Sequence, residues 1–182
     1  PRVELPGVGE NLQDHLQLRM IFKLGANART LNTMAATAWG KLKIGLEYTL
    51  LRSGPMSMAP SQLGAFARSD ASQATPNLQY HIQPLSLEKF GDPLHAFPAF
   101  TASVCNLRPT ARGHVRIASA DSYAVPKISP LYLSTPEDRQ VAAAALALTR
   151  RIVAAPAMQA YAPEEYKPGV EYQTEQELAQ AA

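Results

Sequence analysis

The chain has 182 residues, of which 46% are hydrophobic and 18% are charged; this composition is typical of one globular domain, or of one domain with a fragment of another, and excludes a disordered tail. Its net charge is only +2 and its basic residues never form a run of five, which argues against nucleic-acid binding. The longest apolar run, 141–148, is far shorter than the about 20 residues that cross a bilayer, so the sequence predicts no membrane span.

The first half of the chain predicts one helix among three strands. Alternation with period two, or enrichment in strand-forming residues, indicates the strands, and apolar residues at spacings of three and four indicate the helix. These elements cover residues 16–24 (strand), 34–52 (helix), 63–68 (strand) and 78–83 (strand). The helix carries an apolar stripe that begins at Trp39, and we expect this stripe to lie in the core.

The second half predicts two strands followed by two helices. The strands cover residues 100–107 and 114–119, and the helices begin at Pro136 and near Thr174. The short connection between the strands contains a proline and a glycine, which favours an antiparallel hairpin. Thr135 can cap the first of these helices, and the sequence TEQE resembles a capping box at the second. Residues 84–98 are rich in proline and predict an irregular segment.

These elements together predict an α+β fold, with a mostly antiparallel sheet and helices packed on one face. Because two helices can cover only one face, we expect the other face to expose apolar area, with residues such as Leu78, Tyr80 and Ile82 in need of a partner. Self-association of the chain through that face is the expected result.

The residues alone do not form a complete catalytic or metal-binding motif. No two of the four histidines are three to five residues apart, so zinc-ligand spacing is absent. Gly7 and Gly9 lack the third glycine of a dinucleotide-binding loop and predict a plain turn. Cys105 lies in a predicted strand without an activating base near it in the sequence, which indicates an inert thiol. A single cysteine and the lack of a signal-peptide pattern favour a cytoplasmic location.

Three longer motifs occur in a fixed order and cover most of the chain. They are LPGVGENLQDH (5–15), GPMSMAPSQLGAFARS (54–69) and LRPTARGHVRIASAD (107–121), followed by PKISPLYL (126–133) and the acidic start of a helix. In this order and spacing the motifs resemble the glucose-methanol-choline (GMC) family of flavin oxidoreductases. The choline-dehydrogenase-like branch is the most similar.

The resemblance implies an enzyme built from two halves. A Rossmann-type half binds FAD, and a half built on an antiparallel sheet covers the flavin and shapes the substrate pocket. Residues 1–182 resemble the second half, the substrate-binding domain. The FAD-binding half is absent, and the catalytic histidine is expected beyond Ala182, so no catalytic residue is assigned. The full enzyme would oxidise the CH–OH group of a small alcohol and pass hydride to FAD, whereas the fragment alone is expected to be inactive and free of FAD.

The resemblance also suggests site residues. Asn11, Asp14 and His15 would join the two halves or approach the cofactor, unless they only fix the local turn through side-chain-to-backbone bonds. Gln62 aligns with a position where choline-oxidising relatives carry a Glu that faces the substrate cation; because glutamine is neutral, choline is a doubtful substrate. Arg108 could bind a carboxylate or carbonyl oxygen of the substrate. Both could instead be ordinary residues of a strand edge and a hairpin mouth.

A second hypothesis is a stand-alone binding module that has lost the flavin half and catalyses no reaction. Resemblance of fold alone does not distinguish the two, because related folds carry different functions.

Overall fold

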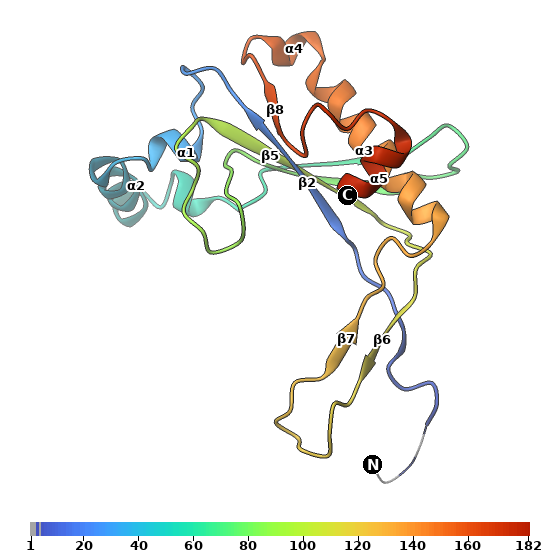
Figure 1. Cartoon of the computed structure of the whole chain (residues 1–182). Helices are drawn as coiled ribbons and strands as arrows, with labels where there is room; N and C mark the ends of the chain where they lie inside the picture. Colours follow the sequence, from blue (N-terminus) through green and yellow to red (C-terminus); the bar gives the residue numbers. More distant parts are fainter. Residues whose placement is uncertain (1–2, 4) are drawn as a thin grey trace.

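The computed structural model describes residue 3 and residues 5–182, and it contains two antiparallel sheets, with C-terminal helices packed on one face of the larger sheet (Figure 1). The larger sheet has the strand order β3-β4-β5-β2-β8, and the smaller one has the order β1-β6-β7. The smaller sheet projects from the larger one as an arm, to which the N-terminal segment belongs (Figure 1). The predicted α+β class is confirmed.

The strands of the larger sheet are β2 (Gln17–Lys23), β3 (Leu63–Ala67), β4 (Leu78–Gln83), β5 (Ala99–Asn106) and β8 (Glu164–Lys167). The strands of the arm are β1 (Glu10–Leu12), β6 (Gly113–Arg116) and β7 (Lys127–Ser129). The helices are α1 (Leu31–Met34), α2 (Ala38–Leu51), η1 (Pro55–Ser57, a 3-10 helix), α3 (Pro136–Val153), α4 (Pro156–Gln159) and α5 (Glu175–Ala181).

The core lies between the larger sheet and α3, with α5 packed beside α3. The strand register places Leu18 opposite Val104 and Met20 opposite Ala102, and these side chains join the apolar side of α3 in one buried cluster. Leu78 and Tyr80 on β4 belong to the same cluster. The strand residues that were expected to face an uncovered side are therefore the ones that the helices cover.

Helix α3 has the start that the sequence predicts. The Thr135 hydroxyl accepts a hydrogen bond from the Asp138 amide at 3.2 Å, and Pro136 occupies the first turn. At the other end, the Arg150 side chain donates two hydrogen bonds to the carboxylate of Glu165, both 2.8 Å long. This ion pair joins α3 to β8, a short polar strand that the sequence analysis did not predict.

The predicted hairpin of 100–107 with 114–119 is wrong. Strand β5 stays in the larger sheet, while β6 leaves it and pairs with β1 and β7 in the arm. The reason lies in the connection, where the Asp138 carboxylate accepts the backbone N–H groups of Thr110 at 2.8 Å and Ala111 at 2.9 Å. These bonds hold the chain at the start of α3, so that it does not turn back along β5.

The position predicted for the helix stripe that begins at Trp39 is also wrong. Trp39 and Leu50 are 70% and 74% exposed, and among the described residues of α2 only Ile44 is buried. Helix α2 stands apart from the larger sheet, next to α1 (Figure 1). Helical spacing shows that an apolar face exists, but it does not show what covers that face.

The irregular segment 84–98 is confirmed and is fixed by a buried asparagine. The side-chain amide of Asn32 donates to the backbone oxygens of Ser86 at 3.0 Å and His95 at 2.9 Å. The Thr101 hydroxyl donates to the backbone oxygen of Leu85 at 2.8 Å. The segment thus closes over one end of the sheet. Within the described part of the chain, no helix is both long and apolar enough to cross a membrane.

Candidate functional site

The first and third sequence motifs meet in the arm. Gly9 has a φ of 84°, and its carbonyl accepts the Val115 amide at 2.7 Å. A Cβ atom at this position would lie 2.0 Å from the Val115 oxygen, so only glycine fits. Beside it, Arg116 pairs with Glu10 at 3.1 Å. The first and third motifs therefore contribute strands β1 and β6, which pair with each other.

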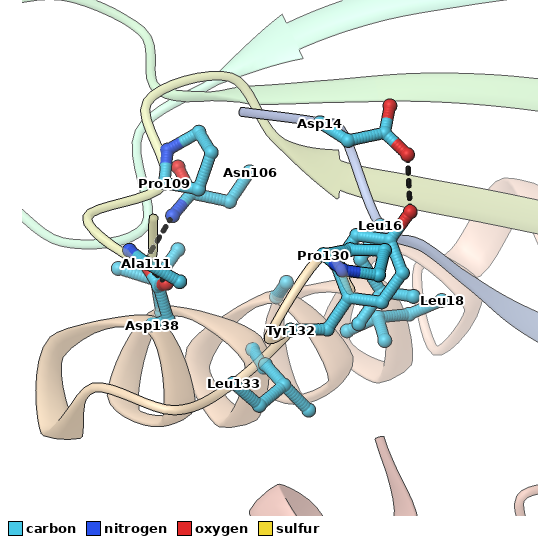
Figure 2. Close-up of a pocket in the computed structure, with 13 residues that line it drawn as sticks. Asp14, Leu16, Leu18, Asn106, Pro109, Ala111, Pro130, Tyr132, Leu133 and Asp138 are labelled. Carbon is cyan, nitrogen blue, oxygen red and sulfur yellow. Dashed lines mark hydrogen bonds between the residues drawn. The ribbon is translucent and has the colours of Figure 1, made fainter. Parts of the chain in front are cut away.

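Asp14 lies where the arm meets the larger sheet, beside a small cavity (Figure 2). Its carboxylate accepts hydrogen bonds from the Tyr132 hydroxyl and from the His15 amide, the latter at 2.9 Å. The Tyr132 bond, followed by the amide bond, lowers the pKa of Asp14, and the same carboxylate raises the pKa of Tyr132. The cavity volume is about 30 Å³, which is room for one or two waters and not for an alcohol substrate.

The three residues predicted to approach a cofactor make contacts within this chain. Asn11 has a φ of 60°, a left-handed conformation that asparagine tolerates better than most residues. A ring nitrogen of His15 lies 3.2 Å from the Leu107 carbonyl oxygen. Together with the Asp14–Tyr132 bond, these contacts fix the base of the arm. A role of Asn11, Asp14 or His15 toward a cofactor stays a prediction.

The face of the larger sheet opposite α3, the helix-free face, is mostly polar on its central strands, although it also contains the buried Ile21 of β2 and the exposed Phe66 of β3. The register aligns His81, Ser103 and Arg19 in one row across β4, β5 and β2. A second row contains Gln79, Cys105 and Gln17. The central strands therefore do not show the expected apolar uncovered face, because the helices cover the apolar side of these alternating strands.

The central strands of the helix-free face carry positive charge, whereas the edge strand β8 places Glu164 opposite Lys23. Arg19 and Lys23 lie on it in β2, and β4 and β5 contain no Asp or Glu at all. The Nε and Nη2 atoms of Arg19 are buried and have no hydrogen-bond partner. Cys105 is buried on the same face, and burial raises the pKa of its thiol, in agreement with the predicted inert thiol. Among the described residues, no cluster of three His, Cys, Asp or Glu could hold a metal ion.

The two predicted substrate-binding residues are not brought together. The backbone N–H of Gln62 donates to the backbone oxygen of Ile82 at 2.9 Å and continues the β3–β4 pairing. The exposed side chain of Gln62 lines an open groove of about 530 Å³ beside Pro84. Arg108 is exposed beyond the other end of β5, where its amide donates to Asn106 at 3.0 Å. The full length of β4 separates the two positions, roughly 17 Å at the rise of a strand. The alternation in β2 could have indicated that Arg19 lies on the polar side of this strand. Only the strand order shows that Ser103 and His81 lie beside it.

Comparison with known proteins places these features in a family. Residues 109–182 match the family model described as GMC oxidoreductase. The oxygen-dependent choline dehydrogenase of Escherichia coli strain K12 is 37% identical over 96% of this chain, and that of Proteus mirabilis is 35% identical over the same share. The chain spans 31% of the length of each.

Solved structures share the fold. Formate oxidase from Aspergillus oryzae superposes with a TM-score of 0.83 at 17% identity, over 97% of this chain and 35% of its own. Pyridoxine 4-oxidase from Mesorbium loti gives a TM-score of 0.74 at 21% identity, over 98% of this chain and 31% of its own. The match of residues 109–182 and the choline dehydrogenase relatives agree with the GMC oxidoreductase resemblance of the three motifs. The chain is similar to the choline dehydrogenases over nearly its whole length.

Proposed function

We propose that residues 1–182 are the substrate-binding part of an FAD-dependent alcohol dehydrogenase or oxidase. The similarity to choline dehydrogenases over 96% of the chain supports an enzyme that acts on a CH–OH group. The single observation that carries the substrate-binding role is the helix-free face, a polar sheet surface whose reverse side is packed against α3. Such a surface suits the wall of a pocket in which a few polar groups orient a small molecule.

The residues present do not form a dinucleotide cradle. The polar groups of Asp14 and His15 are engaged with Tyr132 and Leu107 of the same chain, and the turn at Gly9 packs on β6. FAD would therefore be held by residues outside this chain. When bound there, it would accept the hydride lost by the alcohol carbon, while the hydroxyl proton passes to a base that also lies outside.

The contribution of this chain would be binding and orientation. A wall of amide, hydroxyl and guanidinium donors fixes the alcohol relative to the acceptor, and correct positioning lowers the barrier without a reacting residue. Gln62 is neutral and the central strands of the helix-free face carry cations, so the expected substrate is not a quaternary ammonium alcohol.

The test compares the full-length protein that contains this chain with residues 1–182 alone. We expect the full-length protein to show a flavin absorbance spectrum that primary alcohols bleach under anaerobic conditions. The 182-residue chain should be colourless after gel filtration. A full-length protein without flavin, or one whose flavin no alcohol reduces, would reject the proposal.

A stand-alone binding module is the second candidate, and the mostly polar helix-free face favours it, because that face is formed entirely by strands of this chain. A natural protein confined to these 182 residues, which binds a small ligand without flavin, would support the module against the enzyme.

A further inference from the structure

The open groove beside Gln62 is built from three separate stretches of the chain. Its walls come from the segment around α1, from η1 with the residues after it, and from the residues that follow β4 directly. Backbone hydrogen bonds join these stretches, because the Leu31 amide donates to the Pro84 oxygen at 2.8 Å and the Gln62 amide donates to the Ile82 oxygen at 2.9 Å. The groove is therefore formed without a ligand, as is usual for sites that bind small molecules.

The lining of this groove is mainly apolar. Hydrocarbon and thioether surface is supplied by Leu31, Met34, Met58, Pro60 and Leu85. Among these residues Met58 is 44% exposed, and its sulfur accepts the side-chain amide of Gln62 at 3.7 Å. Because a thioether is a weak acceptor and a flexible group, this contact can adapt to the shape of a ligand.

A quaternary ammonium group needs features that this lining lacks. Such a group is held by aromatic faces and by negative charge, and a cation that leaves water without them loses its hydration. Among the described residues that line the groove, none is aromatic and none is acidic, and the only charged one is Arg29, an exposed cation. The groove therefore suits a ligand that is apolar and uncharged.

We infer that this groove binds the uncharged hydrocarbon body of the substrate, and that Met58 and Gln62 determine a preference for neutral alcohols over quaternary ammonium alcohols. The substrate class is a primary alcohol with a bulky apolar body. The similarity to choline dehydrogenases then does not carry choline as the substrate of this chain. The inference rests on the proposed function for the reaction, whereas binding of the apolar body requires no flavin.

The experiment uses the full-length protein and two alcohols of nearly the same shape. In 3,3-dimethylbutan-1-ol a carbon atom replaces the charged nitrogen of choline. Wild type should prefer this neutral alcohol to choline by about 30-fold or more in kcat/KM, because the cation of choline would lose water without gaining a carboxylate or a ring.

Substitutions at the groove should change this preference. Met58→Asp should reduce it by about tenfold, because it adds a carboxylate to the lining, and Gln62→Glu should reduce it in the same direction. The matched control is Met56→Asp, because Met56 is an exposed methionine of η1 that does not line the groove, and it should change the preference by less than about twofold. A ratio of two substrates is insensitive to a general loss of folded enzyme.

A second measurement does not depend on turnover. The tertiary alcohol 2,3,3-trimethylbutan-2-ol has no hydrogen on its carbinol carbon, so it cannot lose hydride to a flavin. Ligand-observed NMR with the full-length protein should detect binding of this alcohol and no binding of tetramethylammonium. Met58→Asp should weaken the binding of the tertiary alcohol by about fivefold or more, because a charge replaces apolar surface, and Met56→Asp should leave it unchanged.

The two measurements separate the inference from the proposed function. A wild type that lacks flavin but binds the tertiary alcohol through Met58 rejects the proposed function and keeps the binding site. A flavin enzyme that oxidises choline as well as the neutral alcohol, or that prefers 4-hydroxybutanoate to both, keeps the proposed function and overturns the inference. Equal effects of Met58→Asp and Met56→Asp, or no binding of the tertiary alcohol to wild type, would also overturn it, since the remainder of the protein would then close the groove.

Discussion

The two faces of the larger sheet differ in which side chains they bury and in how their charged groups are paired. On the face covered by α3 and α5, apolar side chains are buried together, and the ionic group at its edge, Arg150, has its partner Glu165 in place. On the helix-free face the side chains of the central strands are mostly polar, and the Nε and Nη2 atoms of Arg19 are buried without a hydrogen-bond partner. The comparison shows that the first face is complete within this chain. The second face leaves these two nitrogens without an acceptor among the described residues.

The largest expected effect distinguishes the two arginines. Arg150→Met should lower the free energy of unfolding by about 3–5 kcal/mol, because it leaves Glu165, whose side chain is only 6% exposed, buried without its cation. In the 182-residue chain, Arg19→Met should change the free energy of unfolding by less than about 0.5 kcal/mol or raise it, because no partner is lost. Urea unfolding followed by circular dichroism measures both free energies. Equal losses of stability in the two variants would contradict the difference between the paired Arg150 and the unpaired Arg19.

The next effect tests the packed face. Leu78→Ala should destabilise the protein by about 2–4 kcal/mol, since Leu78 is fully buried in the cluster against α3 and its truncation leaves a cavity. Gln79→Ala, one residue further along β4 on the helix-free face, is the matched control and should cost about 0.5 kcal/mol or less. A control that costs as much as Leu78→Ala would mean that the helix-free face also contributes to the core.

A third variant tests the attachment of the arm. Asp138→Ala should cost about 2–3 kcal/mol, because the amides of Thr110 and Ala111 lose their acceptor and α3 loses an acidic residue in its first turn. Its exposed neighbour Glu137 keeps the same charge near the helix start, so Glu137→Ala isolates the dipole contribution and should cost about 0.5 kcal/mol. Equal melting temperatures for the two variants would contradict the role of Asp138 as an anchor.

The smallest effect concerns pH. Tyr132→Phe should raise the pKa of Asp14 toward its usual value, since the Tyr132 hydroxyl is the main cause of its lowering. A carboxyl whose pKa is lower in the folded state stabilises the protein above its unfolded pKa of about 3.9, and that stabilisation is lost as the pH falls through the folded pKa. The contribution is small, because Asp14 is exposed. NMR titration of the Asp14 carboxyl gives the pKa directly. An unchanged pKa in Tyr132→Phe would show that the Tyr132 hydroxyl does not lower the pKa of Asp14.

The sequence by itself determined the features that depend on near neighbours or on whole motifs. Alternation predicted β2 and β4, and Thr135 with Pro136 predicted the start of α3, because such signals act over a few residues. The three ordered motifs predicted the resemblance to the GMC family, with which the comparisons agree.

Only the tertiary structure decided which of these elements meet. The bonds of Asp138 sent β6 into the arm, no described segment covers the apolar stripe at Trp39, and the strand order set Arg19 beside Ser103 and His81. Each of these facts depends on pairing between residues that lie tens of positions apart. Local periodicity states which face of a strand is apolar, whereas the closing of long loops and the strand order decide what each face contacts, and no local pattern in the sequence records that choice.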